Sequence, residues 1–169
     1  MEPLWHRHRK DTEAVLKEIH VTIKAMRVLG ALTLLVVGGV HLQQYLAGYS
    51  DVPTIGTLFV LNAVGAAAVA VGLLVPFKRL VSDRRADLAV GLLSALGAMI
   101  AVGALIALFI SESEPLFGFM EVGYSSAIVI AIVSEAITTI LLVPVAAAHL
   151  RRAASADRPP RFSRPVSSH

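Results

Sequence analysis

Four long stretches of the chain carry almost no charged residue, and they set the expected architecture. Residues 28–50, 52–77 and 88–111 contain no Lys, Arg, Asp or Glu, and residues 122–150 contain only Glu135. A helix that crosses the hydrocarbon core of a bilayer needs about 20 mostly apolar residues, with its backbone polar groups paired inside the helix. The pattern predicts an all-α membrane protein, an antiparallel bundle of four transmembrane helices. We place the spans near residues 27–47, 54–77, 86–111 and 122–148.

The segments between these stretches agree with helices that run up and down across the membrane. Ser50 and Asp51 offer an N-cap for the second span, and Pro53 suits its first turn. Residues 78–85 form a short charged turn, which favours antiparallel neighbours.

The two ends of the chain are polar and are expected to lie outside the membrane domain (residues 27–148). Residues 1–26 have too many charges and no small-residue cleavage site, so they do not read as a cleaved signal peptide. Apolar residues recur at helical spacing between Val15 and Met26, which fits either an interfacial amphipathic helix or a solvated extension of the first span. Residues 149–169 are basic, rich in Pro and Ser, and are expected to form a disordered tail.

The distribution of charge along the chain predicts the orientation. The net charge is only +3, but all 15 Lys and Arg residues lie before the first span, between the second and third, or after the fourth. The other two connections hold Asp51, Glu112, Glu114 and Glu121 and no basic residue. By the positive-inside rule both termini are cytoplasmic (N-in, C-in), in a multi-pass protein of the plasma membrane.

Composition and motifs argue against several classes of protein. The chain has no cysteine, which removes disulfides, thiolate nucleophiles and cysteine-held metal centres. No HExxH, P-loop or Gly-x-Ser-x-Gly motif occurs, and the intramembrane stretches offer no pair of histidines at matched depth for a haem. We therefore expect a non-enzymatic protein with no cofactor or metal. The basic segments flank a membrane, so no nucleic acid is expected as a partner.

Small residues indicate which helix faces pack together, because lipid gives helices no hydrophobic reason to associate. In the third span one face carries five small residues: Gly91, Ser94, Gly97, Ala98 and Ala101. Gly103 and Ala107 form a further small-xxx-small pair. Close helix packing is the expected role of both sets.

Glu135 is the one charged residue that topology does not explain. It lies near the middle of the fourth span, where inserting a charged side chain costs about 2.5–3.5 kcal/mol. It must therefore face the bundle or a cavity, carry a proton, or have a partner. His41 and Asn62 are expected at a similar depth, in the outer half of the membrane.

Tyr45, Gln44 and Thr138 complete a predicted polar cluster around Glu135. One interpretation is a site for a proton, an ion or a small ligand, formed by Glu135, His41, Asn62, Tyr45 and Thr138. The other is a buried hydrogen-bond network that only fixes helix register.

Two functions follow from these observations. The first is a non-enzymatic accessory or scaffold subunit that contacts the lipid bilayer and either a membrane-protein partner or further copies of itself. The alternative is a small transporter or proton/ion-coupled permease with Glu135 as its protonatable site. A polar cavity reaching Glu135 favours transport, whereas a dry interior with an exposed small-residue face favours the subunit.

One part of the chain resembles a group of known proteins. The segment from His41 to Tyr45, followed by Pro53, Gly56, Phe59 and Asn62, resembles small four-helix membrane proteins of high-GC bacteria over residues 28–77. The 11 Arg against 4 Lys are compatible with such a genome. The resemblance implies the same topology and a bacterial plasma membrane, and it implies nothing about mechanism.

Overall fold

The computed structural model describes residues 4–115 and 125–156, and the regular secondary structure of this part of the chain is all helical, with no strand. The predicted all-α bundle of four helices is confirmed, and each helix is long and apolar enough to cross a membrane. The long helices are α1 (Leu4–Leu46), α2 (Pro53–Leu74), α3 (Asp83–Ser113) and α4 (Ser126–Ser155). Two short 3-10 helices, η1 (Tyr49–Asp51) and η2 (Phe77–Arg79), lie in the connections α1–α2 and α2–α3.

Several helix ends differ from the expected spans by a few residues, and the ends of α2 and α4 have a clear physical reason. α2 ends at Leu74, three residues early, because Val75 precedes Pro76 and a residue before proline avoids the helical region. α4 continues to Ser155, so residues 149–155 are helical, a correction to the expected tail. That segment is rich in Ala, Leu and Arg, which favour helix. The rest of the predicted tail, residues 157–169, lies outside the described residues.

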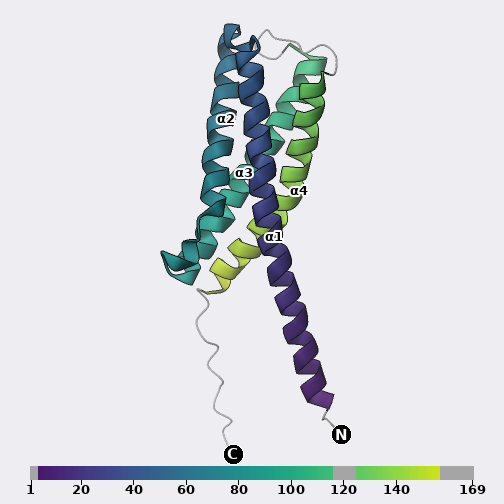
Figure 1. The fold of residues 1–169 in the computed structure, drawn as a ribbon, viewed down its shortest axis with the longest axis vertical. Coiled ribbons are helices and arrows are strands. Elements are labelled where there is room, and N and C mark those ends of the chain that lie inside the picture. Colours follow the sequence, from purple (N-terminus) through teal and green to yellow (C-terminus); the bar gives the residue numbers. More distant parts are fainter. Residues whose placement is uncertain (1–3, 116–124, 157–169) are drawn as a thin grey trace, which may run out of the picture.

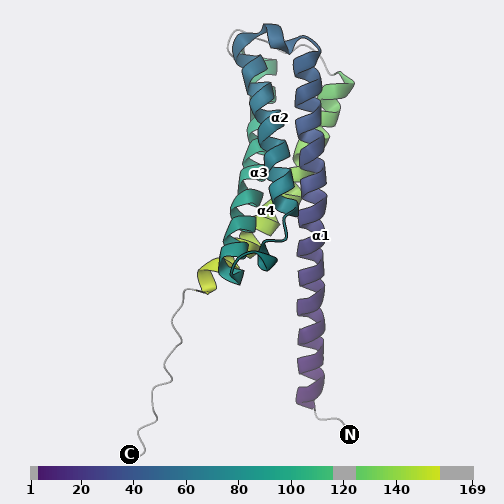
Figure 2. The same cartoon turned by 60° about the vertical axis from the view of Figure 1, so that its left-hand side comes forward.

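α1 is one unbroken helix of 43 residues. It extends well past the other three helices at one end of the bundle (Figures 1 and 2). Residues 11–22 are exposed there, so the segment before the first span continues that span directly instead of forming a separate element. We call this end, which also holds η2 and the end of α4, the η2 end, and the opposite end the η1 end.

The four helices form a ring in which α1 packs against both α2 and α4, and α3 packs against α4. α2 and α3 pack less closely, and α1 and α3 lie diagonally opposite. At the η1 end, Gly56 lets η1 lie directly on α2, since a side-chain Cβ there would be 2.6 Å from the carbonyl oxygen of Tyr49. The expected proline in the first turn of α2 is present as Pro53.

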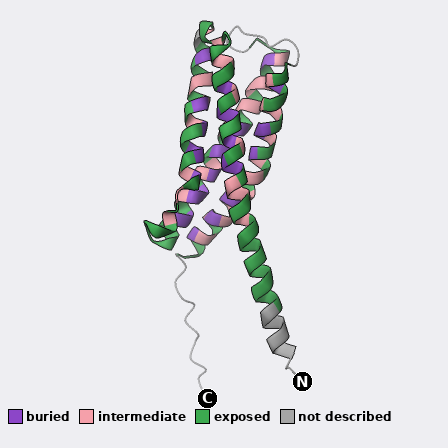
Figure 3. Cartoon of the chain, viewed as in Figure 1, coloured by how far each residue is buried: buried purple, intermediate pink, exposed green. Residues whose placement is uncertain are grey.

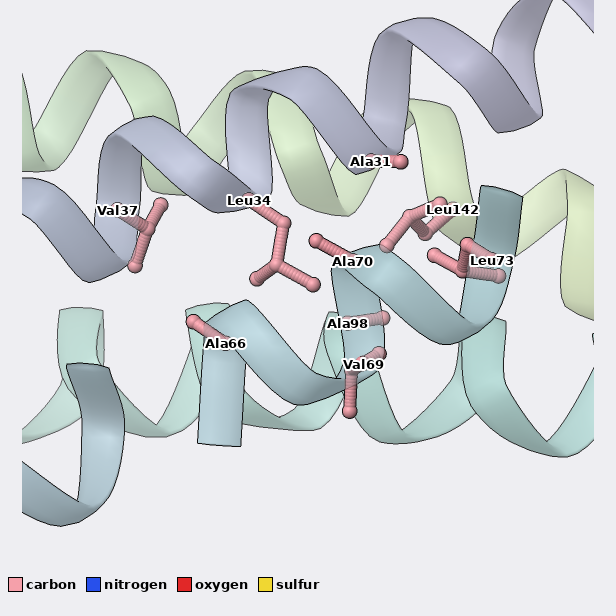
Figure 4. Close-up of a cluster of buried hydrophobic side chains, with 9 residues drawn as sticks. All are labelled: Ala31, Leu34, Val37, Ala66, Val69, Ala70, Leu73, Ala98 and Leu142. Atoms are coloured by element: carbon pink, nitrogen blue, oxygen red, sulfur yellow. The ribbon is translucent and has the colours of Figure 1, made fainter. Parts of the chain in front are cut away.

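The hydrophobic core occupies the middle of the bundle towards the η2 end. Its buried side chains are Ala31, Leu34, Val37, Ala66, Val69, Ala70, Leu73, Ala98 and Leu142 (Figure 4). The helices converge at Gly97, where a Cβ would lie 2.7 Å from Leu142 Cδ1, 3.1 Å from Leu34 Cδ2 and 3.3 Å from Val69 Cγ1. The expected close packing of the small-residue face of α3 is thus confirmed, since all five residues are buried.

Large apolar side chains on the outside of the bundle are exposed along its whole length (Figure 3). Such a surface is unusual for a soluble domain and suits contact with lipid. The core, in contrast, closes the centre of the bundle and separates its η1 half from its η2 half.

Candidate functional site

A cavity of about 400 Å³ lies in the η1 half of the bundle, next to the core. All four long helices contribute to its wall, and most of the lining side chains are apolar. Its polar lining residues are His41, Gln44, Asn62, Ser111 and Glu135. A mostly apolar pocket of roughly 300–1,000 Å³ with a few convergent polar groups is typical of small-molecule sites.

Glu135 is the most unusual of these residues. The residue is 1% exposed, yet within the described part of the chain its Oε2 atom has no hydrogen-bond partner. Leaving a buried polar atom unpaired costs about 1–3 kcal/mol, so the arrangement does not serve the stability of the fold. The α4 backbone places it there, and Thr139 Oγ1 donates to the Glu135 carbonyl oxygen at 2.9 Å.

His41 faces Glu135 across the cavity from α1. The distance between His41 Nε2 and Glu135 Oε1 is 3.8 Å, which is too long for a hydrogen bond. His41 Nδ1 lies 2.9 Å from the carbonyl oxygen of Val37, and because a carbonyl only accepts, Nδ1 carries the proton. Nε2 of the neutral ring is then an acceptor directed towards Glu135. Phe59 holds the ring edge-on, with centroids 5.2 Å apart.

The structure brings together three of the five predicted site residues. Glu135, His41 and Asn62 line the same cavity, and Asn62 Oδ1 is a second buried oxygen without a hydrogen-bond partner among the described residues. Tyr45 and Thr138 do not line the cavity. Thr138 instead donates from Oγ1 to Thr33 Oγ1 at 2.9 Å, joining α4 to α1.

Gly103 and Ala107 also line the cavity, so the expectation that they form a close helix contact is wrong for this pair. Among the described residues, nothing lies within 4 Å of the place where a Cβ of Gly103 would be. Their small size leaves space instead of allowing a neighbouring backbone to approach.

A second buried polar contact, at the η2 end, was not predicted from the sequence. His149 Nδ1 lies 2.9 Å from Asp87 Oδ1, and the pair joins α4 to α3. Asp87 directly precedes a charge-free stretch and therefore looks like a flank. Its spacing to Gly91 and Ser94 nevertheless places it on the buried face of α3, and that periodicity is the signal that could have found it.

The cavity offers proton and hydrogen-bond chemistry. Of the described residues that line it, Glu135 and His41 are the two whose side chains gain and lose a proton, and one proton can reside on either of them. No group of three or more His, Cys, Asp or Glu in the described residues is placed to hold a metal ion.

Comparison of the chain with protein-family models, with curated protein sequences and with solved structures gives no match. Fold and site together define the class: a multi-pass integral membrane protein of four helices with a cavity beside a buried carboxyl group.

Proposed function

We propose that the protein is a small transporter that exchanges a proton for a cationic ligand at Glu135. The main support for this proposal is that the buried carboxyl group of Glu135 lines a cavity of about 400 Å³ and has one oxygen without a hydrogen-bond partner among the described residues. A purely structural network would pair its polar atoms, because unpaired buried groups destabilise a fold.

The chemistry of exchange follows from the surroundings of Glu135. In the absence of ligand the carboxyl group carries a proton, because a lone carboxylate among apolar groups is costly. When a cation enters, the proton leaves to bulk water and the carboxylate remains, paired with the cation. The charge of the site is unchanged by this exchange. Proton and ligand therefore compete for the same carboxyl group.

Proton release on binding tests this proposal directly. The purified protein in lipid nanodiscs, weakly buffered and with a pH indicator, is titrated with two probes that stay cationic at every pH used, acetamidinium and 4-hexylbenzamidinium. We expect one proton released per bound cation, and an apparent affinity that rises about tenfold per pH unit while Glu135 holds its proton. In vesicles with an acidic interior, the same cation should accumulate inside.

The matched controls are two carboxyl-to-amide changes. Glu135→Gln removes the exchangeable proton with little change in shape, so release and uptake should be lost. Glu114→Gln alters an exposed carboxylate at the end of α3 and should leave both unchanged. Release that persists in Glu135→Gln, or no release with either probe, would overturn the proposal.

The membrane and the orientation belong to the same proposal. The one-sided distribution of the 15 basic residues supports both termini in the cytoplasm. The resemblance of residues 28–77 to membrane proteins of high-GC bacteria favours a bacterial plasma membrane. The η1 half, where the cavity lies, then faces outward.

The second candidate function, an accessory subunit, is favoured by one observation. Val15, Leu16 and Ile19 are exposed on the part of α1 that extends beyond the bundle, where a partner protein would find an apolar surface. Isolation of the native membrane complex in mild detergent tests this role. A stoichiometric partner that is lost with Leu16→Lys would support it, and a protein that purifies alone would count against it.

A further inference from the structure

The residues that line the cavity differ in how far they are exposed, and this difference shows where the cavity opens. The lining residues from α1 and α4 are buried or half-buried. Every described lining residue that is itself exposed belongs to α2 or α3: Leu58, Leu61, Met99 and Gly103. Leu61 is 62% exposed and Met99 is 70% exposed although both line the cavity. The opening therefore lies between α2 and α3, the adjacent pair that packs least closely.

The opening is at the depth of the hydrocarbon core. Leu61 is eight residues from the start of α2, about 12 Å along the helix. Gly103 is ten residues from the end of α3, about 15 Å. A bilayer core is about 30 Å thick, so a ligand passing between these residues comes from among the lipid chains and not from water.

The two helices close again nearer the core. A Cβ at Gly65 would lie 3.5 Å from Ile100 Cδ1, and one at Gly72 would lie 3.1 Å from Leu93 Cδ1. At Gly103, by contrast, the described residues leave open space. The opening is thus a local seam beside Gly103, while the rest of the α2–α3 contact is packed.

The unpaired polar atoms of the cavity determine which polar group of a ligand can bind there. Glu135 Oε2 and Asn62 Oδ1 are oxygens without a hydrogen-bond partner in the described part of the bundle, and both accept hydrogen bonds once Glu135 has lost its proton. A cation that carries N–H groups satisfies both atoms and neutralises the carboxylate. An anion would meet a carboxylate in an apolar wall, and a cation without N–H groups would leave both oxygens unpaired.

We infer that the ligand is a single-chain amphiphilic cation taken from the membrane. Its N–H-bearing head binds at Glu135 and Asn62, and its hydrocarbon chain leaves the cavity between α2 and α3 beside Gly103. This inference rests on the proposed function, since it assigns the substrate class and the entry route of the same site.

The length of the probe's hydrocarbon chain tests whether the cavity is open between α2 and α3 or closed. Benzamidinium probes with butyl, hexyl, decyl and hexadecyl chains are titrated into nanodiscs, and affinity is expressed per mole fraction in the lipid, so that partitioning cancels. Because the chain extends into lipid, the hexadecyl probe should bind within about threefold of the hexyl probe. Dodecyltrimethylammonium, which has a chain and a charge but no N–H group, should bind at least about tenfold more weakly, because loss of the charged hydrogen bond to Glu135 alone accounts for that factor.

Two glycine substitutions test the route. Gly103→Leu fills the seam, and the decyl and hexadecyl probes should lose at least about tenfold in affinity through overpacking. Gly39→Leu is the matched control, because the described residues also leave open space there and Gly39 does not line the cavity. It should leave every probe unaffected.

The outcomes separate the two proposals. The inference is supported if the decyl and hexadecyl probes bind to the unmodified protein, lose their affinity in Gly103→Leu and keep it in Gly39→Leu. If binding of acetamidinium or the butyl probe causes Glu135-dependent proton release but the decyl and hexadecyl probes do not bind, the inference is overturned and the proposed function stands. The inference is likewise overturned, and the proposed function retained, if dodecyltrimethylammonium binds as well as the N–H-bearing probes. Absence of Glu135-dependent release with all probes overturns both.

Discussion

Replacing Glu135 by leucine tests whether its carboxyl group serves function or holds the fold together. Without ligand the carboxyl group is protonated and neutral, and a buried polar group left unpaired costs about 1–3 kcal/mol in lost hydrogen bonding. The structure gives little to set against that cost, because the contact to His41 is 3.8 Å long and Oε2 is unpaired within residues 4–115 and 125–156. Glu135→Leu should therefore stabilise the bundle by about 1–3 kcal/mol while abolishing proton release.

The assay is reversible unfolding in mixed micelles, followed by circular dichroism over a titration with sodium dodecyl sulfate. Val133→Leu changes an exposed position on the same helix and should shift the unfolding free energy by less than about 0.5 kcal/mol. Glu135→Gln keeps the shape and a polar group, so we expect a change within about 1 kcal/mol. A loss of more than about 1 kcal/mol in Glu135→Leu would refute this reasoning, since it would mean that Glu135 holds the fold together.

Three further predictions concern packing and orientation. Gly97→Ala should lower the unfolding free energy by about 1–2 kcal/mol in the same titration, because its Cβ meets Leu142, and Gly39→Ala should show no loss. Asp87→Leu leaves His149 without its partner and should cost about 2–4 kcal/mol, whereas Asp87→Asn, which keeps an acceptor, should cost less than half of that. A reporter enzyme that works only in the cytoplasm should be active when fused after the last residue, and activity of a periplasmic reporter at the same place would contradict the charge-based orientation.

The four spans could be predicted because the membrane imposes one simple requirement, a long apolar stretch, on each of them. The helix ends were harder to predict, since α2 stops at Leu74, two residues before Pro76, while α4 continues through a polar, helix-forming segment to Ser155. Hydropathy reports where lipid lies and does not report where a helix ends.

The cavity itself could not be predicted from the chain. Gly97 and Gly103 look alike in the sequence, yet one brings four helices together and the other leaves a space. The difference depends on whether a neighbouring helix approaches, which no local pattern encodes. Glu135 was identifiable because a charge in an apolar stretch has few explanations, whereas Asp87 was hidden by its position beside the charged turn.

The unbroken length of α1 has a mechanical consequence. Its 43 residues make a rod about 65 Å long, more than twice the thickness of the hydrocarbon core. His41 sits near one end of this rod, and the exposed residues 11–22 lie near the other. Because no break separates the two ends of α1, a tilt of its exposed end would also move the His41 ring in the wall of the cavity.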